Sequence, residues 1–466
     1  MTGDLRIKSP AARLAISGVR SAIPTTTHPP PHRPAATVRL RQAVGVAFGV
    51  TVIVGNTIGA GILRTPGEVA AQLPTPFAFF SVWVLGGVYA LLGAICLAEL
   101  GTLLPASGGQ YVYARTALGE YAGFVVGWSD WISTCGTTAA VSIVIGEYSS
   151  ALIPALQGRT VAIALSVTLL FAILQWRGVK WGSRTQEITG FLKMAAFCAV
   201  VGACFLWAPV RPSGAANVVT FTHIGAIVIA LQAVIYTYDG WAAVIYFSEE
   251  VRNGARNIPR ALFVGVASII AIYLGVNLAI FYVLPISEIA GRNLALAHAA
   301  QIVFGALGDP LVRGLMIISM LSGINAYHLM ASRVLFAMSR DSLVSRRACA
   351  VNEGGTPIVA LALSAAVAVL FIVGSGTFDE VIAVLSFFFV ANYTLSFASL
   401  FVLRRTMPDA PRPYRAWGYP FTPAIALLGS VAFLAGAVAG DTRRSLWALA
   451  LLAASFPVWR LLRMIR

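Results

Sequence analysis

The sequence has few charged residues, and this shortage excludes an ordinary water-soluble protein. Asp, Glu, Lys and Arg make up 11% of the 466 residues, whereas hydrophobic residues make up 58%. A soluble domain of this length cannot cover its surface with so few charges. The composition therefore indicates an integral membrane protein that has the lipid bilayer as the surroundings of most of its chain.

Acidic residues and cysteines are scarce as well. The chain has 18 Asp and Glu residues against 33 Lys and Arg residues, a formal net charge of +15. The basic residues gather in short segments between apolar runs, where they set membrane orientation, so we expect no nucleic-acid partner. The five cysteines lie in apolar runs or in one loop and form no CxxC pair. The sequence thus indicates no disulfide framework, no metal site and no cofactor.

Long apolar runs dominate the rest of the chain. About twelve of them reach or approach the roughly 20 residues that a membrane-spanning helix needs. These runs are 43–65, 77–99, 120–147, 160–176, 186–208, 223–248, 261–284, 313–338, 357–375, 380–403, 421–440 and 445–460. They do not show the alternation over about ten residues that is typical of a transmembrane barrel. The sequence predicts an all-α integral membrane protein with about twelve transmembrane helices.

The distribution of Lys and Arg predicts that both termini are cytoplasmic and that the protein is a multi-pass protein of the cytoplasmic membrane. With the N-terminus inside, the inner segments carry 25 of the 33 basic residues. Residues 1–42 are rich in Pro, Thr and Arg and lack the apolar core of a signal peptide, so we expect a disordered basic cytoplasmic tail. We expect a transporter core at 43–404, and a cytoplasmic loop with the last two transmembrane helices at 405–466.

Two of the apolar runs are interrupted by glycine and polar residues. The first contains GNTIGAGI, Gly55–Ile62, and the sixth contains YTYDGW, Tyr236–Trp241. They are five spans apart, so they occupy equivalent places in an inverted repeat of five plus five helices over about 43–208 and 223–404. Such paired interruptions indicate the binding site of a secondary transporter. For the first run, a helix-packing face of small residues is the alternative.

A break in a membrane helix frees backbone groups that a ligand can satisfy. Glycine permits the break and lets a ligand approach the chain closely. Freed N–H groups at the start of a half-helix suit a carboxylate, and freed C=O groups at the end of one suit an ammonium. Two breaks side by side therefore predict a receptor for a zwitterion. The expected binding residues are Thr57, Ile58, Gly59, Ala60, Gly61 and Ile62 in the first run and Tyr236, Thr237, Tyr238, Asp239 and Gly240 in the sixth.

These segments, with three others, resemble the amino acid–polyamine–organocation superfamily, and within it the L-type amino acid transporters and their bacterial relatives. The similar motifs are GNTIGAGILRTPG, AELGTLLPASGGQYVYARTALG, YDGWAAVIYFSEEVRNGARNIPRAL, INAYHLMASRVLFAMSRD and RPYRAWGYPFTP. The resemblance extends over about 43–425. It implies the leucine-transporter fold, in which two inverted five-helix repeats and two terminal helices work by alternating access and helices 1 and 6 are unwound.

The resemblance also implies how an L-amino acid is held near the middle of the membrane. The N–H groups of Ala60 and Gly61 would bind the carboxylate. The carbonyl groups of Thr57, Tyr236 and Asp239 would bind the amine, and Tyr236 takes the place of the family's aromatic gate.

Two further expectations follow from the sequence near these motifs. Trp241, directly after the sixth-run break, is either a second gate residue or a core aromatic. Animal members of the family pair with a single-span glycoprotein through a cysteine in the loop after the third span. The corresponding segment here, GEYSSALIPALQGR, has no cysteine, so we expect no disulfide-linked heavy chain.

Three charged side chains fall well inside the expected spans: Asp130, Lys193 and Asp239. A charge at a helix centre costs about 2.5–3.5 kcal/mol on insertion scales, so each needs a role. Lys193 is a candidate proton-coupling residue, because the resemblance places a lysine here against the unwound first span. A fixed brace and a lysine that reaches the interface are the alternatives. Asp239 either caps the break or favours cations, and we expect Asp130 to be buried and either paired or protonated.

The sequence predicts a secondary active transporter of neutral or a broad range of L-amino acids, driven by protons. An amino acid exchanger is the alternative, and a sensor without flux is a third candidate. The motifs that an intramembrane enzyme needs, such as HExxH or G-x-S-x-G, do not occur. Glu249 and Glu250 lie within reach of Arg333 or Arg340, which indicates either an inner gate of ion pairs or a solvated helix end.

Overall fold

A computed structural model of the chain describes residues 40–208, 224–375, 378–440 and 442–465. The chain divides into two units, Met1–Thr37 and Val38–Arg466, and all described residues belong to the second. Most of the expected tail at 1–42 therefore lies outside the described residues. Within the described ranges the secondary structure is helical, apart from two isolated bridges, Val44 with Val251 and Val351 with Pro357.

Helices overlap each of the apolar runs that the sequence contains. The longer elements are α1 (Val46–Thr57), α2 (Gly61–Gln72), α3 (Pro76–Leu103), α5 (Glu120–Leu152), α6 (Thr160–Trp176), α7 (Val179–Trp207), α8 (Ile224–Tyr238), α9 (Gly254–Val283), α12 (Gly308–Arg340), α13 (Ile358–Ser375), α14 (Phe378–Thr406), α15 (Phe421–Gly440) and α16 (Thr442–Ile465). Shorter elements between them include α4 (Gln110–Leu118), η2 (Ala243–Phe247), α10 (Ile286–Ile289), α11 (Ala295–Phe304) and η4 (Arg346–Cys349).

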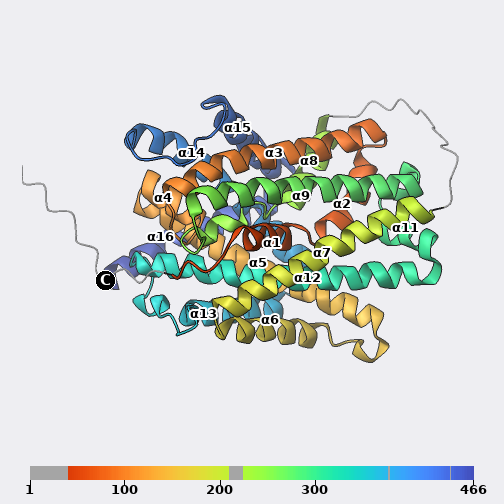
Figure 1. Ribbon diagram of the computed structural model, residues 1–466, viewed down its shortest axis with the longest axis horizontal. Helices are drawn as coiled ribbons and strands as arrows, with labels where there is room; N and C mark the ends of the chain where they lie inside the picture. The colour runs from red at the N-terminus through yellow and green to blue at the C-terminus, as the bar shows by residue number, and fades with distance from the viewer. Residues whose placement is uncertain (1–39, 209–223, 376–377, 441, 466) are drawn as a thin grey trace, which may run out of the picture. The chain divides into compact units, whose positions relative to one another are not determined.

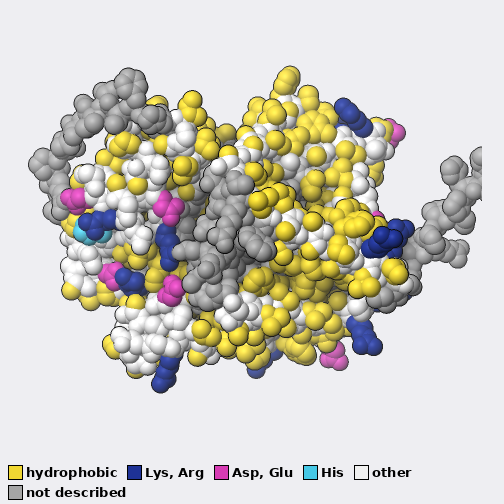
Figure 2. Space-filling model, turned by 180° about the vertical axis from the view of Figure 1, so that it is seen from behind, with side chains coloured by type: hydrophobic (Ala, Val, Ile, Leu, Met, Phe, Trp, Pro, Cys, Tyr) yellow, Lys and Arg dark blue, Asp and Glu magenta, His cyan; other side chains and the backbone are white. Residues whose placement is uncertain are grey.

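Length and apolar composition identify the chain as a multi-pass membrane protein. Among the described helices, seven are long and apolar enough to cross a membrane, or eight if α1 and α2 count as one bent span. Figure 2 shows the corresponding surface: hydrophobic side chains cover a broad band of the described surface, and most Lys, Arg, Asp and Glu side chains gather toward the two ends of the visible face. Such a belt suits contact with lipid between two aqueous compartments.

The first apolar run folds as two helices rather than as one. α1 ends at Thr57, α2 begins at Gly61, and the pair is bent by 47°. The expected end of this run at residue 65 is wrong, because α2 continues to Gln72. Hydropathy does not reveal this continuation, because the charged residues Arg64 and Glu68 lower the mean hydropathy of the segment. Figure 1 shows α1 in the middle of the bundle, where it packs against α7, α9 and α12.

The sixth run also changes conformation, and its turn packs against the first break. α8 ends at Tyr238, and the chain turns through Gly240 before the short 3₁₀ helix η2. Gly240 has a φ of +102°, which disfavours any residue with a side chain. A Cβ atom there would also lie 2.7 Å from Nδ2 of Asn56, which donates a hydrogen bond to the Gly240 carbonyl. The two interrupted segments thus lie side by side.

Candidate functional site

The two interrupted segments open onto one cavity of about 250 Å³, whose remaining wall comes mainly from α5, α12 and α14. Eight of the expected binding residues line it: Thr57, Gly59, Ala60, Gly61, Tyr236, Thr237, Asp239 and Gly240. Ile58, Ile62 and Tyr238 do not, because their side chains are buried in the surrounding core. Sequence proximity to the break led us to expect these three at the cavity, but successive residues face different directions.

The start of α2 offers unpaired amide groups. Among the described residues, the N–H groups from Gly59 to Ile62 donate no backbone hydrogen bond, and the first such bonds run from Leu63 and Arg64 to the Ala60 carbonyl. This is the usual state of the first turn of a helix, which attracts anions. Ala60 and Gly61, the predicted carboxylate ligands, both lie in this turn and line the cavity.

We expected the carbonyl groups at the breaks to lack hydrogen-bond partners, but several of them accept hydrogen bonds within the protein. The Tyr273 hydroxyl lies 2.9 Å from the Thr57 carbonyl oxygen and 2.8 Å from that of Thr237, so it joins the two breaks. The Tyr236 carbonyl accepts from the Asp239 N–H at 3.0 Å. A carbonyl oxygen has two lone pairs, so the Thr57 carbonyl retains the capacity for one further hydrogen bond. No sequence pattern pointed to Tyr273, which lies on α9 in an apolar run.

Lys193 is anchored at the first break. Its side chain is 0% exposed, and Nζ donates to the carbonyl oxygens of Gly55, at 3.0 Å, and Ile58. The Ser319 hydroxyl donates to the same Ile58 carbonyl at 2.8 Å. The alternative of a lysine reaching the membrane interface is therefore wrong. Lys193 instead satisfies carbonyl groups that the break in α1 and α2 leaves without a helical partner.

A buried amide network fixes α1 next to this lysine. The Gln186 side-chain amide on α7 donates to the Thr51 carbonyl at 3.0 Å and to the Ser322 hydroxyl at 3.1 Å. Asn325 on α12 in turn donates to the Gln186 side-chain oxygen at 2.9 Å and accepts from Gln175 on α6. The network holds the first half-helix to three neighbouring helices.

The Asp239 side chain, directly after α8, accepts a hydrogen bond from another helix of the cavity wall. The Tyr393 hydroxyl on α14 donates to Oδ1 of Asp239 at 2.9 Å. The Tyr393 ring stacks on Trp241, with ring centroids 5.0 Å apart. Trp241 itself is 1% exposed and does not line the main cavity, so its geometry is that of a core aromatic rather than a gate. Tyr236 does line the cavity.

Ion pairs join α12 to the residues that follow η2, which was one of the two alternatives that the sequence left open. Arg333 binds both carboxylate oxygens of Glu250 at 2.9 and 3.0 Å, and Arg340 binds Glu249 at 2.7 Å. The Glu249 carboxylate also accepts from the Leu40 and Ser107 N–H groups. The alternative of a solvated helix end is wrong for these residues, since Arg333 and Glu250 are each 1% exposed.

A further contact extends this polar layer to α4. The Tyr111 hydroxyl lies 2.7 Å from Oδ2 of Asp341, which also pairs with Arg115 at 2.8 Å. Burial, with the Asp341 carboxylate adding to it, raises the pKa of Tyr111. The phenol therefore stays protonated and acts as the donor to Asp341.

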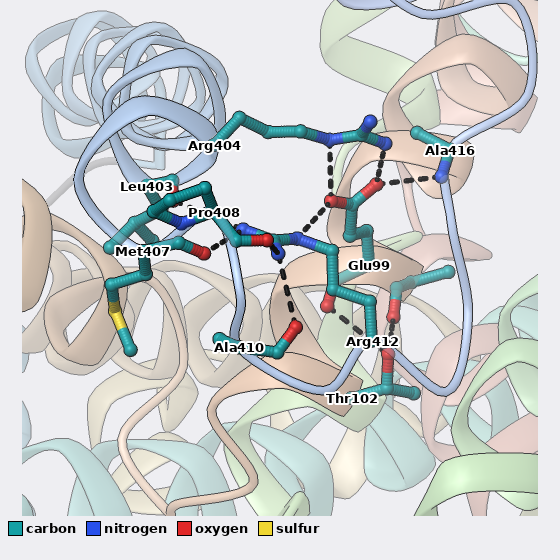
Figure 3. A network of polar contacts seen from close by, with 10 residues as sticks. Glu99, Thr102, Leu403, Arg404, Met407, Pro408, Ala410, Arg412 and Ala416 are labelled. Atoms are coloured by element: carbon teal, nitrogen blue, oxygen red, sulfur yellow. Dashed lines mark hydrogen bonds and ion pairs between the residues drawn. The ribbon is translucent and has the colours of Figure 1, made fainter.

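Glu99 forms the centre of an ion-pair cluster that sequence reasoning missed (Figure 3). Its carboxylate, 0% exposed, accepts two bonds from Arg404 at 2.8 and 2.5 Å and one from Arg412 at 3.1 Å. It also accepts from the Ala416 N–H at 2.7 Å. The cluster ties the end of α3 to the end of α14 and to the loop before α15. Two sequence features could have indicated the cluster: the carboxylate of Glu99 at the end of an apolar run, and the arginines of RRTMPDAPRPYRAW.

Asp130 is buried and hydrogen-bonded, as expected. Its side chain on α5 is 3% exposed and lines the cavity. Oδ1 accepts from the Tyr246 hydroxyl on η2 at 2.9 Å. Thr137, two helical turns along α5 from Asp130, lines the same cavity.

Comparison with known proteins places the chain in a family. The sequence model described as amino acid permease matches residues 41–456. Serine/threonine exchanger SteT of Bacillus subtilis is 27% identical over 435 residues, which cover 90% of this chain and 96% of that protein. The human Asc-type amino acid transporter 1 is 28% identical over 393 residues, 81% of this chain and 74% of its own. The mouse b(0,+)-type amino acid transporter 1 is 27% identical over 417 residues, 85% of this chain and 82% of its own. Because the family match covers most of the sequence, the chain belongs to the amino acid permease family of the APC superfamily, a family of transporters rather than enzymes.

Proposed function

We propose that this protein moves L-amino acids, neutral or of a broad range, across the cytoplasmic membrane by alternating access. The observation that carries the proposal is that two broken helices line one cavity and present both kinds of backbone group to it. Unpaired N–H groups suit the carboxylate of an amino acid, and carbonyl groups with remaining lone pairs suit its ammonium. Similarity to named amino acid transporters and an exchanger supports the same conclusion.

The proposed fold is that of twelve spans with a five-plus-five inverted repeat. In this proposal α1 with α2 forms the first span and α8 with η2 the sixth, so the breaks fall at equivalent places of the two repeats. The core covers 43–404, the last loop and two spans cover 405–466, and both termini face the cytoplasm. The concentration of Lys and Arg in segments on that side supports the orientation.

Each end of the substrate has its own ligands in this proposal. The N–H groups of Ala60 and Gly61 bind the carboxylate, and the Thr57, Tyr236 and Asp239 carbonyls bind the amine. Thr57 does so with its second lone pair, because the Tyr273 hydroxyl engages the first. Tyr236 closes the cavity as the aromatic gate.

Two modes of energy coupling are candidates, and Lys193 has a different role in each. In a proton symporter, Lys193 gains and loses a proton. This weakens or strengthens its hydrogen bonds to the Gly55 and Ile58 carbonyl oxygens at the break. In an exchanger, the same two hydrogen bonds act as a permanent brace. We favour the symporter; the exchanger is the second candidate, because SteT, which aligns with 90% of this chain, is named as an exchanger.

The proposal is tested with the purified single chain in proteoliposomes. Uptake of labelled alanine, leucine and arginine is measured with and without an inward proton gradient, and with and without unlabelled amino acid inside. Symport gives accumulation that follows the gradient in vesicles without internal amino acid. Uptake that requires internal amino acid and ignores the gradient identifies an exchanger. No uptake of any amino acid in either condition contradicts the proposed function. Activity of the chain by itself also tests our expectation that no heavy chain is needed.

A further inference from the structure

One face of α5 forms a continuous side of the cavity. Asp130, Thr134, Thr137 and Val141 all line it, at spacings that place them on the same stripe of a helix. Asp130 is the acidic member of this stripe and belongs to neither interrupted segment. It is therefore separate from the backbone groups to which the proposed function assigns the carboxylate and the amine of the substrate.

The Asp130 carboxylate is only half satisfied. Oδ1 accepts from the Tyr246 hydroxyl at 2.9 Å, whereas Oδ2 is buried and has no hydrogen-bond partner among the described residues. A buried acceptor without a donor is unfavourable. A group of this kind at a cavity wall is accounted for when the occupant of the cavity supplies the donor.

The wall of the cavity holds other polar atoms without a partner. Oε1 of Gln110 and Oγ1 of Thr137 are buried, line the same cavity and have no partner among the described residues. Asn392, whose Oδ1 accepts from Ser129, contributes an unpartnered amide nitrogen. An aliphatic substrate side chain would leave these polar atoms unpaired, whereas a side chain ending in a donor would satisfy at least Oδ2 of Asp130.

We infer that Asp130 forms the side-chain subsite of this transporter and selects amino acids whose side chain ends in a hydrogen-bond donor. The inference rests on the proposed function and narrows its substrate class from neutral amino acids in general. The donor is a hydroxyl, as in serine and threonine, or an amine on a short chain. Both donate to Oδ2 of Asp130 while the two breaks hold the amino acid backbone.

The test measures binding of serine, alanine and 2,3-diaminopropionate to the full chain, by competition against one labelled amino acid that it binds. Serine differs from alanine by the hydroxyl alone, and a site built to pair a hydroxyl rejects the analogue without it. We expect wild-type protein to prefer serine over alanine by about tenfold or more. We expect Asp130→Asn to bring this ratio close to one while alanine binding is retained.

The matched control is Thr138→Val, which removes a buried hydroxyl from the same helix. Thr138 donates to the Thr134 carbonyl and does not line the cavity, so its variant should keep the wild-type ratio. A larger loss for 2,3-diaminopropionate than for serine in Asp130→Asn identifies an amine as the preferred donor, and equal losses identify hydrogen bonding without a charge requirement.

The outcomes separate this inference from the proposed function. If wild-type protein binds alanine as well as serine, or if Asp130→Asn keeps a serine preference, the inference is wrong and the proposed function stands. The wild-type comparison decides the matter even if Asp130→Asn does not fold. If wild-type protein binds no amino acid at all, both are wrong.

Discussion

Arg333 and Glu250 form a two-bond ion pair in the protein interior, between α12 and the segment that follows η2. The two donor–acceptor distances are 2.9 and 3.0 Å, and each side chain is 1% exposed. The Glu250 carbonyl also accepts from the N–H groups of Ala43 and Val44, so the pair lies beside the start of the described chain. One carboxylate thus connects the end of the sixth apolar run to α12.

Removal of Arg333 should strongly destabilise the protein. Arg333→Ala leaves the Glu250 carboxylate buried without a counter-charge, which costs about 3–5 kcal/mol. The thermal midpoint of the purified protein in detergent checks this expectation. Arg340→Ala is the matched control, because its partner Glu249 is 11% exposed and keeps two backbone donors. A midpoint that falls equally in both variants would contradict the importance of burial.

The Glu99 cluster should be a second centre of stability. Glu99→Ala leaves Arg412, which is 4% exposed, without its carboxylate, and also frees the Ala416 N–H. We expect a loss of about 3–5 kcal/mol, as for other buried pairs that lose one partner.

The control for Glu99 is Asp309→Ala on α12. Asp309 pairs with Arg313 one helical turn away, and both are about one quarter exposed. An exposed pair of this spacing contributes about 0.3–0.5 kcal/mol. Unfolding midpoints of the two variants should therefore differ clearly; a similar small shift in both would show that the Glu99 cluster is dispensable.

The sequence was sufficient to predict the helical membrane architecture and the two interrupted runs that line the candidate site. Apolar runs and the glycines Gly55, Gly59, Gly61 and Gly240 mark the helices and their interruptions, because both signals are local. The ion pairs of Arg333 and Arg340 were one of two alternatives, since these arginines and the two glutamates lie at or near the ends of the eighth and sixth apolar runs.

Contacts between distant segments were not predictable in this way. Glu99 pairs with Arg404 and Arg412, which are more than 300 residues later in the chain. Tyr273, which joins the two breaks, lies in an unremarkable apolar run. Ile58, Ile62 and Tyr238 were expected at the cavity because they neighbour the breaks, yet which side chain faces a cavity depends on the local winding of the chain. Hydropathy carries no information on that direction.

Two glycines of the first run should respond differently to the same methyl group. A Cβ at Gly55 would lie 2.0 Å from Nε2 of Gln186 and 2.9 Å from the Ser322 hydroxyl, both part of the buried amide network. Gly55→Ala should therefore cost about 1–3 kcal/mol of stability through overpacking. At Gly59 a Cβ would meet no described atom within 4 Å and would enter the cavity.

Gly59→Ala should accordingly fold normally but bind substrate poorly. We expect an unfolding midpoint close to that of wild type and an amino acid affinity lower by about tenfold or more, because an added methyl group that overpacks a site costs about 1–3 kcal/mol. Melting and binding measured on the same preparations check both halves. Wild-type affinity in Gly59→Ala would show that the substrate does not approach the first break.

Replacement of Lys193 should separate the two coupling modes. Lys193→Ala removes the donors to the Gly55 and Ile58 carbonyls together with the titratable group, whereas Ser319→Ala removes a hydroxyl donor to the same Ile58 carbonyl and no titratable group. If Lys193 carries the proton, Lys193→Ala should lose gradient-driven accumulation while retaining amino acid binding, and Ser319→Ala should keep its dependence on the gradient. If Lys193 is only a brace, both variants should lower the rate of exchange and neither should change its response to pH. Accumulation in Lys193→Ala vesicles that still follows the proton gradient would exclude this lysine as the proton carrier, because coupling would then persist without its titratable group.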